Sequence, residues 1–106
     1  MKKLILATVL SVASVAAVAD SRSELCGAIA GYAEGVMIAH QNGVPLATSL
    51  STTEGEMAES PLLDFYKAIV LEAYGKPRFL VQENKDRASD DFRDKIHLLC
   101  LKSIAK

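Results

Sequence analysis

The chain has 106 residues, of which half are hydrophobic, 12 are Lys or Arg and 13 are Asp or Glu. This length allows one small domain, whose core must be thin because it buries only about 60–65% of the surface of its unfolded chain. The near-neutral charge and the few aromatic residues exclude the basic, aromatic-studded surfaces of nucleic-acid-binding proteins, so we expect no nucleic-acid partner.

Residues 1–19 predict a cleaved signal peptide. Lys2 and Lys3 form a basic start, residues 4–18 are uncharged and apolar or small, and Ala17-Val18-Ala19 matches a signal peptidase site. The apolar run is shorter than the ~20 residues of a membrane span, and no cysteine at the cut provides a lipid anchor. We expect a mature domain of residues 20–106, periplasmic or secreted, with no membrane span after cleavage.

The two cysteines, Cys26 and Cys100, predict one intramolecular disulfide. Two cysteines in an exported chain pair in an oxidising compartment, and two cysteines 74 positions apart lack the paired ligand spacing of a zinc site. We therefore expect no metal site. The bond would close a loop of roughly 75 residues, which is worth on the order of 4 kcal/mol in the chain-entropy model.

Charge is divided between the two parts of the mature chain. Loss of Lys2 and Lys3 leaves 10 basic residues against 13 acidic ones, and residues 20–72 hold eight acids and two bases. Residues 73–106 hold five acids and eight bases. Such polarity either steers a partner or lets the two parts attract each other, and we expect mutual attraction within the fold.

Helix signals dominate the mature chain from its start. Ser21 and Glu24 fit a capping box, and a helix over Ser23 to Gln41 follows, ended by Asn42-Gly43. The spacing of three and four residues predicts an inner face for this helix, formed by Leu25, Ile29, Ala33, Val36 and His40.

A short second helix is predicted after Val44-Pro45, with Leu46 and Leu50 inward, and Ser51 to Ser60 reads as an acidic loop. A third helix begins at Ser60-Pro61 and ends at Gly75, before Pro77. Its predicted stripe is Leu62, Phe65, Ile69 and Ala73, with Leu63, Tyr66 and Val70 beside it.

The region Arg78 to Gln82 is expected to be extended, and a last helix begins between Glu83 and Ser89. Its predicted inner face comprises Phe92, Ile96, Leu99, Cys100 and Ser103. The disulfide forms most easily if the first and last helices are antiparallel. The fold class is therefore all-α, with three long helices and one short helix whose chain ends are tied by the disulfide.

A ladder of small residues, Gly27, Gly31, Gly35 and Ala39, recurs every four residues in the first helix. Each internal glycine costs about 0.8–1 kcal/mol relative to alanine, so a close neighbour is expected to offset the cost. That neighbour is either another helix of the domain or a partner, a second copy of the chain included. We expect internal packing, against the last or the third helix.

Other candidate sites are weak. His40 and His97 are the two histidines of the chain and are expected to be structural, and Glu54, Glu56 and Glu59 lack the alternating pattern of a calcium loop. No serine lies in a glycine-flanked elbow, and no phosphate loop, dinucleotide fingerprint or haem-attachment motif is present. We expect neither catalytic residues nor a cofactor, and hence not an enzyme.

Several residues carry a family resemblance: Cys26, His40-Gln41-Asn42-Gly43-Val44-Pro45, Ala73-Tyr74, Pro77-Arg78-Phe79 and Phe92 before Cys100. They resemble a group of small secreted helical proteins of Gram-negative bacteria and their phages, in which the position of His40 is often arginine. The resemblance implies a secreted, disulfide-bonded helical domain, and because no activity is known for the group it assigns none to any residue.

Two function classes follow. A small stapled domain without catalytic residues suits a periplasmic protein-interaction factor, such as an inhibitor, an immunity factor or a phage-encoded modulator of the envelope. Its partner would be another envelope or secreted protein. The alternative is a periplasmic stress chaperone of the small two-cysteine helical kind, which acid would loosen as carboxylates are protonated.

Overall fold

The computed structural model describes the backbone of residues 2–105 and the side chains of residues 21–103. Within that part the chain is all-helical, with α1 (Lys2–Gln41), α2 (Leu46–Glu56), α3 (Leu63–Tyr74) and α4 (Gln82–Ala105). The all-α prediction is confirmed, and three long helices with one short helix describe it roughly, since α3 is only one residue longer than α2.

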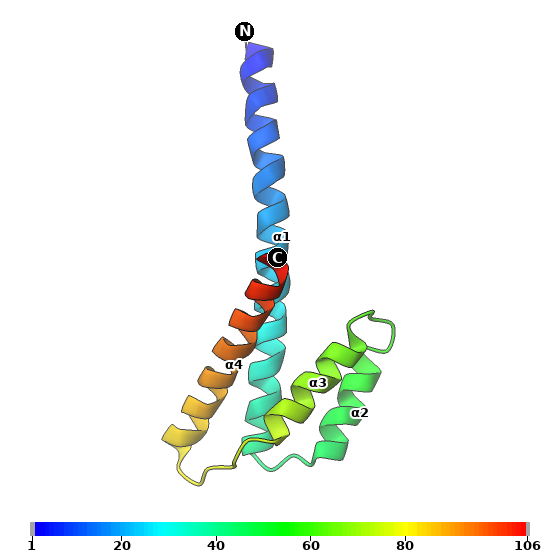
Figure 1. Cartoon of the computed structure of the whole chain (residues 1–106), viewed down its shortest axis with the longest axis vertical. Helices are drawn as coiled ribbons and strands as arrows, with labels where there is room; N and C mark the ends of the chain where they lie inside the picture. Colours follow the sequence, from blue (N-terminus) through cyan, green and yellow to red (C-terminus); the bar gives the residue numbers. More distant parts are fainter. Residues whose placement is uncertain (1, 106) are drawn as a thin grey trace.

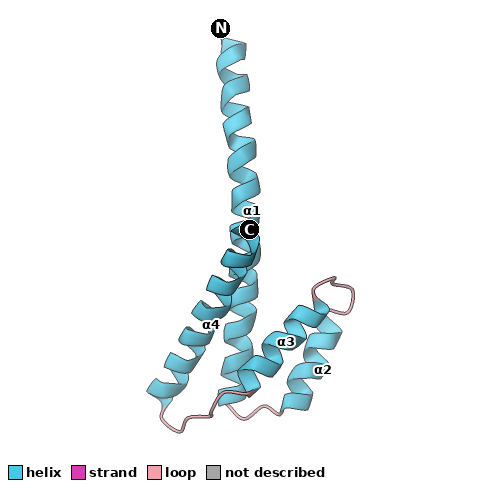
Figure 2. Ribbon diagram, in the orientation of Figure 1, coloured by secondary structure: helices cyan, strands magenta, loops and turns pink. Residues whose placement is uncertain are grey.

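Helix α1 is the central element of the fold (Figure 1). α4 runs antiparallel to it on one side, and the antiparallel pair α2 and α3 lies on the other side. The first half of α1 projects beyond the other helices, and loops account for only the short connections between them (Figure 2). None of the helices in the described part of the chain combines the length and apolar character required to cross a bilayer.

The predicted disulfide is present between Cys26 on α1 and Cys100 on α4, with 5.5 Å between their Cα atoms. Both cysteines are buried, and they continue a core built from one face of each of α1, α3 and α4. Its largest members are Ile29, Met37, Tyr66, Ile69, Phe92 and Ile96. The antiparallel arrangement expected of the first and last helices is what brings the two cysteines together.

The outermost residues predicted for the apolar stripes were assigned wrongly. Leu25, Phe65 and Leu99 are each more than 40% exposed, whereas Ile29, Ala33 and the other central positions are buried. Ser103 is exposed as well. A helix turns 100° per residue, so a stripe of threes and fours drifts around it, and residues at its margins leave a core as thin as this one.

Four helix boundaries also differ from prediction. α3 begins at Leu63 rather than at Ser60-Pro61. α1 is continuous through Ser21 and Glu24 in the full chain, so no capping box starts a helix there, and α4 begins earlier, at Gln82. The predicted acidic loop is helical as far as Glu56. Cleavage after Ala19 stays a prediction, because nothing tests it and the side chains of residues 1–20 lie outside those described.

Candidate partner-binding groove

The small-residue ladder lies on an open surface, and the expected packing against α3 or α4 is wrong. Gly27, Gly31 and Gly35 are exposed, and a Cβ atom added to any of them would meet no atom of the described residues within 4 Å. No helix of the domain therefore occupies the space that these glycines leave. The core-facing residues of α1 lie on the other side of the helix.

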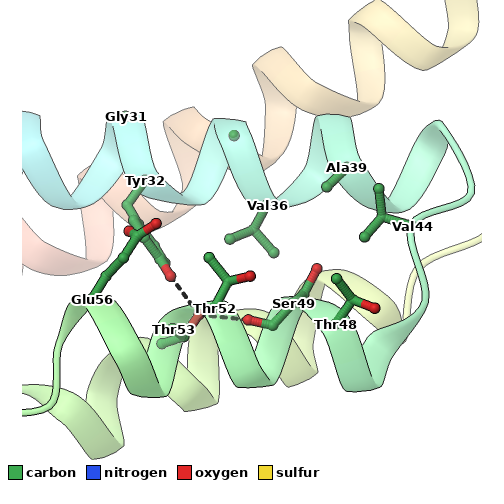
Figure 3. Close-up of a pocket in the computed structure, with 11 residues that line it drawn as sticks. Gly31, Tyr32, Val36, Ala39, Val44, Thr48, Ser49, Thr52, Thr53 and Glu56 are labelled. Carbon is green, nitrogen blue, oxygen red and sulfur yellow. Dashed lines mark hydrogen bonds between the residues drawn. The ribbon is translucent and has the colours of Figure 1, made fainter.

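Part of the ladder lines a groove of about 360 Å³ between α1 and α2 (Figure 3). Gly31, Gly35 and Ala39 contribute the bare part of its α1 wall, which also includes Tyr32 and Val36. Val44 and one face of α2 complete the lining, with Thr48, Ser49, Thr52, Thr53 and Glu56. Gly27 precedes this stretch by one helical turn and is not part of the lining.

The groove is open because most side chains on its two walls are too short to fill the space between them. α2 was predicted to turn Leu46 and Leu50 inward, yet Leu46 is 39% exposed and the buried residues of α2 are Ser49 and Thr53. These two short polar side chains give the helix a hydroxyl-bearing inner face, and α2 packs mainly on α3. The space between α2 and the ladder is left open.

Hydrogen bonds hold the α2 wall in place. Thr53 donates from Oγ1 to the Ser49 carbonyl at 2.9 Å, so its oxygen is free to accept from the Tyr32 hydroxyl. Tyr74 donates to the Val44 carbonyl at 2.7 Å and accepts from Ser49 at 2.6 Å. These bonds link α2 to both α1 and α3, so the groove has a fixed width.

Tyr32 also packs edge-on against Tyr66, with 4.8 Å between ring centroids. Burial, together with the neighbouring Tyr32, raises the pKa of the Tyr66 hydroxyl above its ordinary value. The Tyr66 phenol is therefore neutral at physiological pH, and this contact is a packing interaction rather than an acid–base pair.

A second network fixes the end of α1 to the α3–α4 connection. The buried side chain of Gln41 donates to the Pro77 carbonyl at 2.7 Å and accepts from the Phe79 amide at 2.8 Å. The backbone carbonyl of Gln41 accepts a hydrogen bond from the Lys85 ammonium at 2.7 Å. His40 bonds the Lys76 carbonyl through Nε2 at 2.7 Å. These polar residues therefore have a structural role.

The turn after α1 matches the predicted Asn42-Gly43 stop. Gly43 has a φ of +88°, its amide bonds the His40 carbonyl, and the Val44 amide bonds the Ala39 carbonyl. This pair of bonds is a Schellman ending, which needs the left-handed conformation that glycine adopts without strain. This turn leads the chain from the end of α1 directly to Val44, which is part of the lining of the groove.

The two histidines are far apart. His97 precedes Cys100 by one turn of α4, whereas His40 follows Cys26 by fourteen residues of α1. At 1.5 Å per residue on antiparallel helices, the two levels differ by roughly 16 Å. His40 is buried against Tyr74, with ring centroids 4.4 Å apart. The structure does not bring the two histidines together.

Charged residues of the acidic and basic parts do meet. Arg93 on α4 contacts Glu34 on α1 at 2.7 Å, and Lys95 contacts Glu72 on α3 at 3.0 Å. The hydrogen bond and the charge of Lys95, with a smaller effect of Lys76, lower the pKa of the Glu72 carboxyl. The expected attraction between the two parts is therefore present at these helix contacts.

The acidic side chains near α2 remain separate from one another. Among the described side chains, no group of three His, Cys, Asp or Glu residues is placed to hold a metal ion.

Comparison with protein-family models, curated proteins and solved structures gives no match for this chain. What the groove does must therefore be argued from its own geometry.

Sequence reasoning singled out Gly31, Gly35 and Ala39 but missed the opposite wall. Ser49, Thr53 and Gln41 were not recognised as buried, because polar residues in a predicted short helix or at a helix end are usually exposed. The motif His40-Gln41-Asn42-Gly43 with Pro77-Arg78-Phe79 was the available signal. Its members prove to contact each other across the two connections.

Proposed function

We propose that this protein is a small, non-catalytic interaction factor of the periplasm or the extracellular medium, of the inhibitor, immunity or phage-encoded envelope-modulator type. It would bind another envelope or secreted protein through the groove between α1 and α2. The observation that carries this proposal is the open ladder, because Gly27, Gly31 and Gly35 are exposed with no neighbour within 4 Å of an added Cβ.

The cost of the ladder supports this proposal. Three glycines inside a helix cost on the order of 3 kcal/mol relative to alanine, a large fraction of the 5–15 kcal/mol stability of a typical domain. No contact inside the domain offsets that cost. A partner that approaches the bare backbone of α1 would account for it, and the hydrogen-bonded α2 wall would meet that partner already ordered.

Site-specific cross-linking in a Gram-negative host tests the proposal. A photo-reactive amino acid at Thr52, which is exposed in the groove, should yield one dominant adduct with an envelope or secreted protein. The same residue at exposed Asp94 on α4 serves as a matched control. Gly31→Leu, which fills the groove, should abolish the Thr52 adduct. Equal adducts from both positions, or none from Thr52, would contradict the proposal.

A stress chaperone is the second candidate, favoured by the interhelical ion pairs Glu34–Arg93 and Glu72–Lys95. Protonation of these carboxylates would weaken the attachment of α4 and expose apolar surface. Each pair lies at the surface, where an ion pair contributes little. The test is whether the protein suppresses the aggregation of a client protein at acidic pH. If the ion pairs control this activity, the Lys95→Gln variant should begin to suppress aggregation at a higher pH than the wild-type protein does.

A further inference from the structure

The groove has chemically different ends. Val36, Ala39 and Val44 form an apolar end close to the turn after α1, and Glu56 lies at the opposite end beside Tyr32 (Figure 3). On the α2 wall, Thr48 lies at the same end as Val44, and Thr52 lies between the two ends. An occupant that satisfies both ends must therefore be amphipathic along its length.

The acidic end is not neutralised by the domain itself. α2 carries Glu54 and Glu56 and no basic residue. Glu54 pairs with Lys67 at 3.9 Å, whereas Glu56 makes no ion pair among the described residues. Few positive charges of the domain therefore lie close to the α2 wall. Glu56 is available to pair with a cation from outside the domain.

Charge also argues against a second copy of the chain at this site. A twofold contact places the same surface on both partners, and no Lys or Arg lines the groove, so a second copy would offer Glu56 no cation. A contact that leaves this charge unpaired is disfavoured. The occupant is therefore a different protein with the opposite charge at this position.

The length of the groove indicates the spacing of its ligand. Tyr32, beside the acidic end, and Ala39, at the apolar end, are seven residues apart on α1, about 10 Å along the helix axis. A partner helix covers the same distance between residues i and i+7. The glycines remove the side chains that would keep such a helix away from the backbone of α1.

Resting on the function proposed above, we propose that the groove binds a basic amphipathic helix of the partner protein. One apolar side chain of that helix occupies the Val36–Ala39–Val44 end. A Lys or Arg two turns away pairs with Glu56, its aliphatic stem lying on the ladder.

The probe for this proposal is a displayed library of helical peptides, randomised at positions on one face. It is selected on the oxidised, exported protein with counter-selection on the Gly31→Leu variant, whose groove is filled. We expect enrichment of peptides with an apolar residue and a Lys or Arg seven residues apart. These should bind wild-type protein at least tenfold more tightly than the Gly31→Leu variant.

Charge variants then test the pairing. Glu56→Gln should reduce the affinity for the selected peptides about five- to tenfold and should also reduce the salt dependence of binding. Glu83→Gln, at an exposed position of α4, should leave both the affinity and its salt dependence unchanged. Selected peptides that discriminate Gly31→Leu but lack a basic residue, or that ignore Glu56→Gln, would overturn the proposal and leave the proposed function standing. An absence of discriminating peptides overturns the proposal too, and the Thr52 cross-link then decides the function separately.

Discussion

Replacing the ladder glycines by alanine should stabilise the protein. Gly31 lies inside α1, and its added Cβ would contact nothing within 4 Å, so only helix propensity changes. Alanine is favoured over glycine by about 0.8–1 kcal/mol in a helix interior. Part of this gain arises because alanine restricts the unfolded chain more than glycine does.

The magnitude can be converted into a melting temperature. For a domain of 60–100 residues, 1 kcal/mol shifts the midpoint by about 4–8 °C. Gly31→Ala should therefore raise the melting temperature by about 3–8 °C. The same reasoning applies to Gly27 and Gly35, and the triple variant should gain about 2–3 kcal/mol, since alanines one turn apart do not clash on an open helix face.

Thermal melts and urea unfolding of the oxidised protein measure this effect. Ala28→Gly, also at an exposed position of α1, is the matched control and should lose about 1 kcal/mol. Gly31→Leu should also be tolerated, because the space is empty. A loss of stability in Gly31→Ala would refute the reasoning, since it would mean that another part of the domain fills the ladder in solution.

The other predictions concern the scaffold. Cys26→Ser should cost about 2–5 kcal/mol, and the exported wild-type protein should show the mass of a disulfide and no reactive thiol on unfolding. Gln41→Ala should cost about 2–3 kcal/mol by removing the side-chain hydrogen bonds to Pro77 and Phe79, whereas Asn84→Ala, exposed on α4, should stay within about 0.5 kcal/mol. Because the pKa of Glu72 is lowered in the fold, its contribution is present above its unfolded pKa of about 4 and disappears as pH falls through the lower folded value. Lys95→Gln should raise the pKa of Glu72 in a carboxyl NMR titration, Lys102→Gln should not, and added salt should weaken the same contact.

Local signals in the sequence predicted much of the scaffold correctly. The cysteine pair, the Asn42-Gly43 stop and the central core positions Ile29, Ile69 and Phe92 each follow from one short-range rule. The end of α2 was missed because Ser51 to Glu56 contains serine, threonine and Gly55, which are poor helix formers. Tertiary contacts override that preference: Thr53 is buried and bonded to Tyr32.

The buried polar residues could not be predicted, because each depends on a partner distant in the chain. Gln41 is buried only because the Pro77 carbonyl and the Phe79 amide come to it from the connection between α3 and α4. Nothing in the local sequence shows that these two backbone groups will be adjacent to the end of α1. The hydroxyl-lined wall of the groove has the same origin, since Ser49 is satisfied by Tyr74.

The orientation of the ladder, by contrast, could have been predicted from the sequence. Ile29 and Gly31 are two residues apart, as are Ala33 and Gly35, and two residues turn a helix by about 200°. The ladder and the apolar stripe must therefore face opposite ways, and one core cannot cover both. α3 and α4 cover the stripe, so only α2 remains for the other face, and its short side chains stop short of the glycines. The helical angle places the space beside the glycines outside the core, and the cost of the glycines is the reason for proposing a partner there.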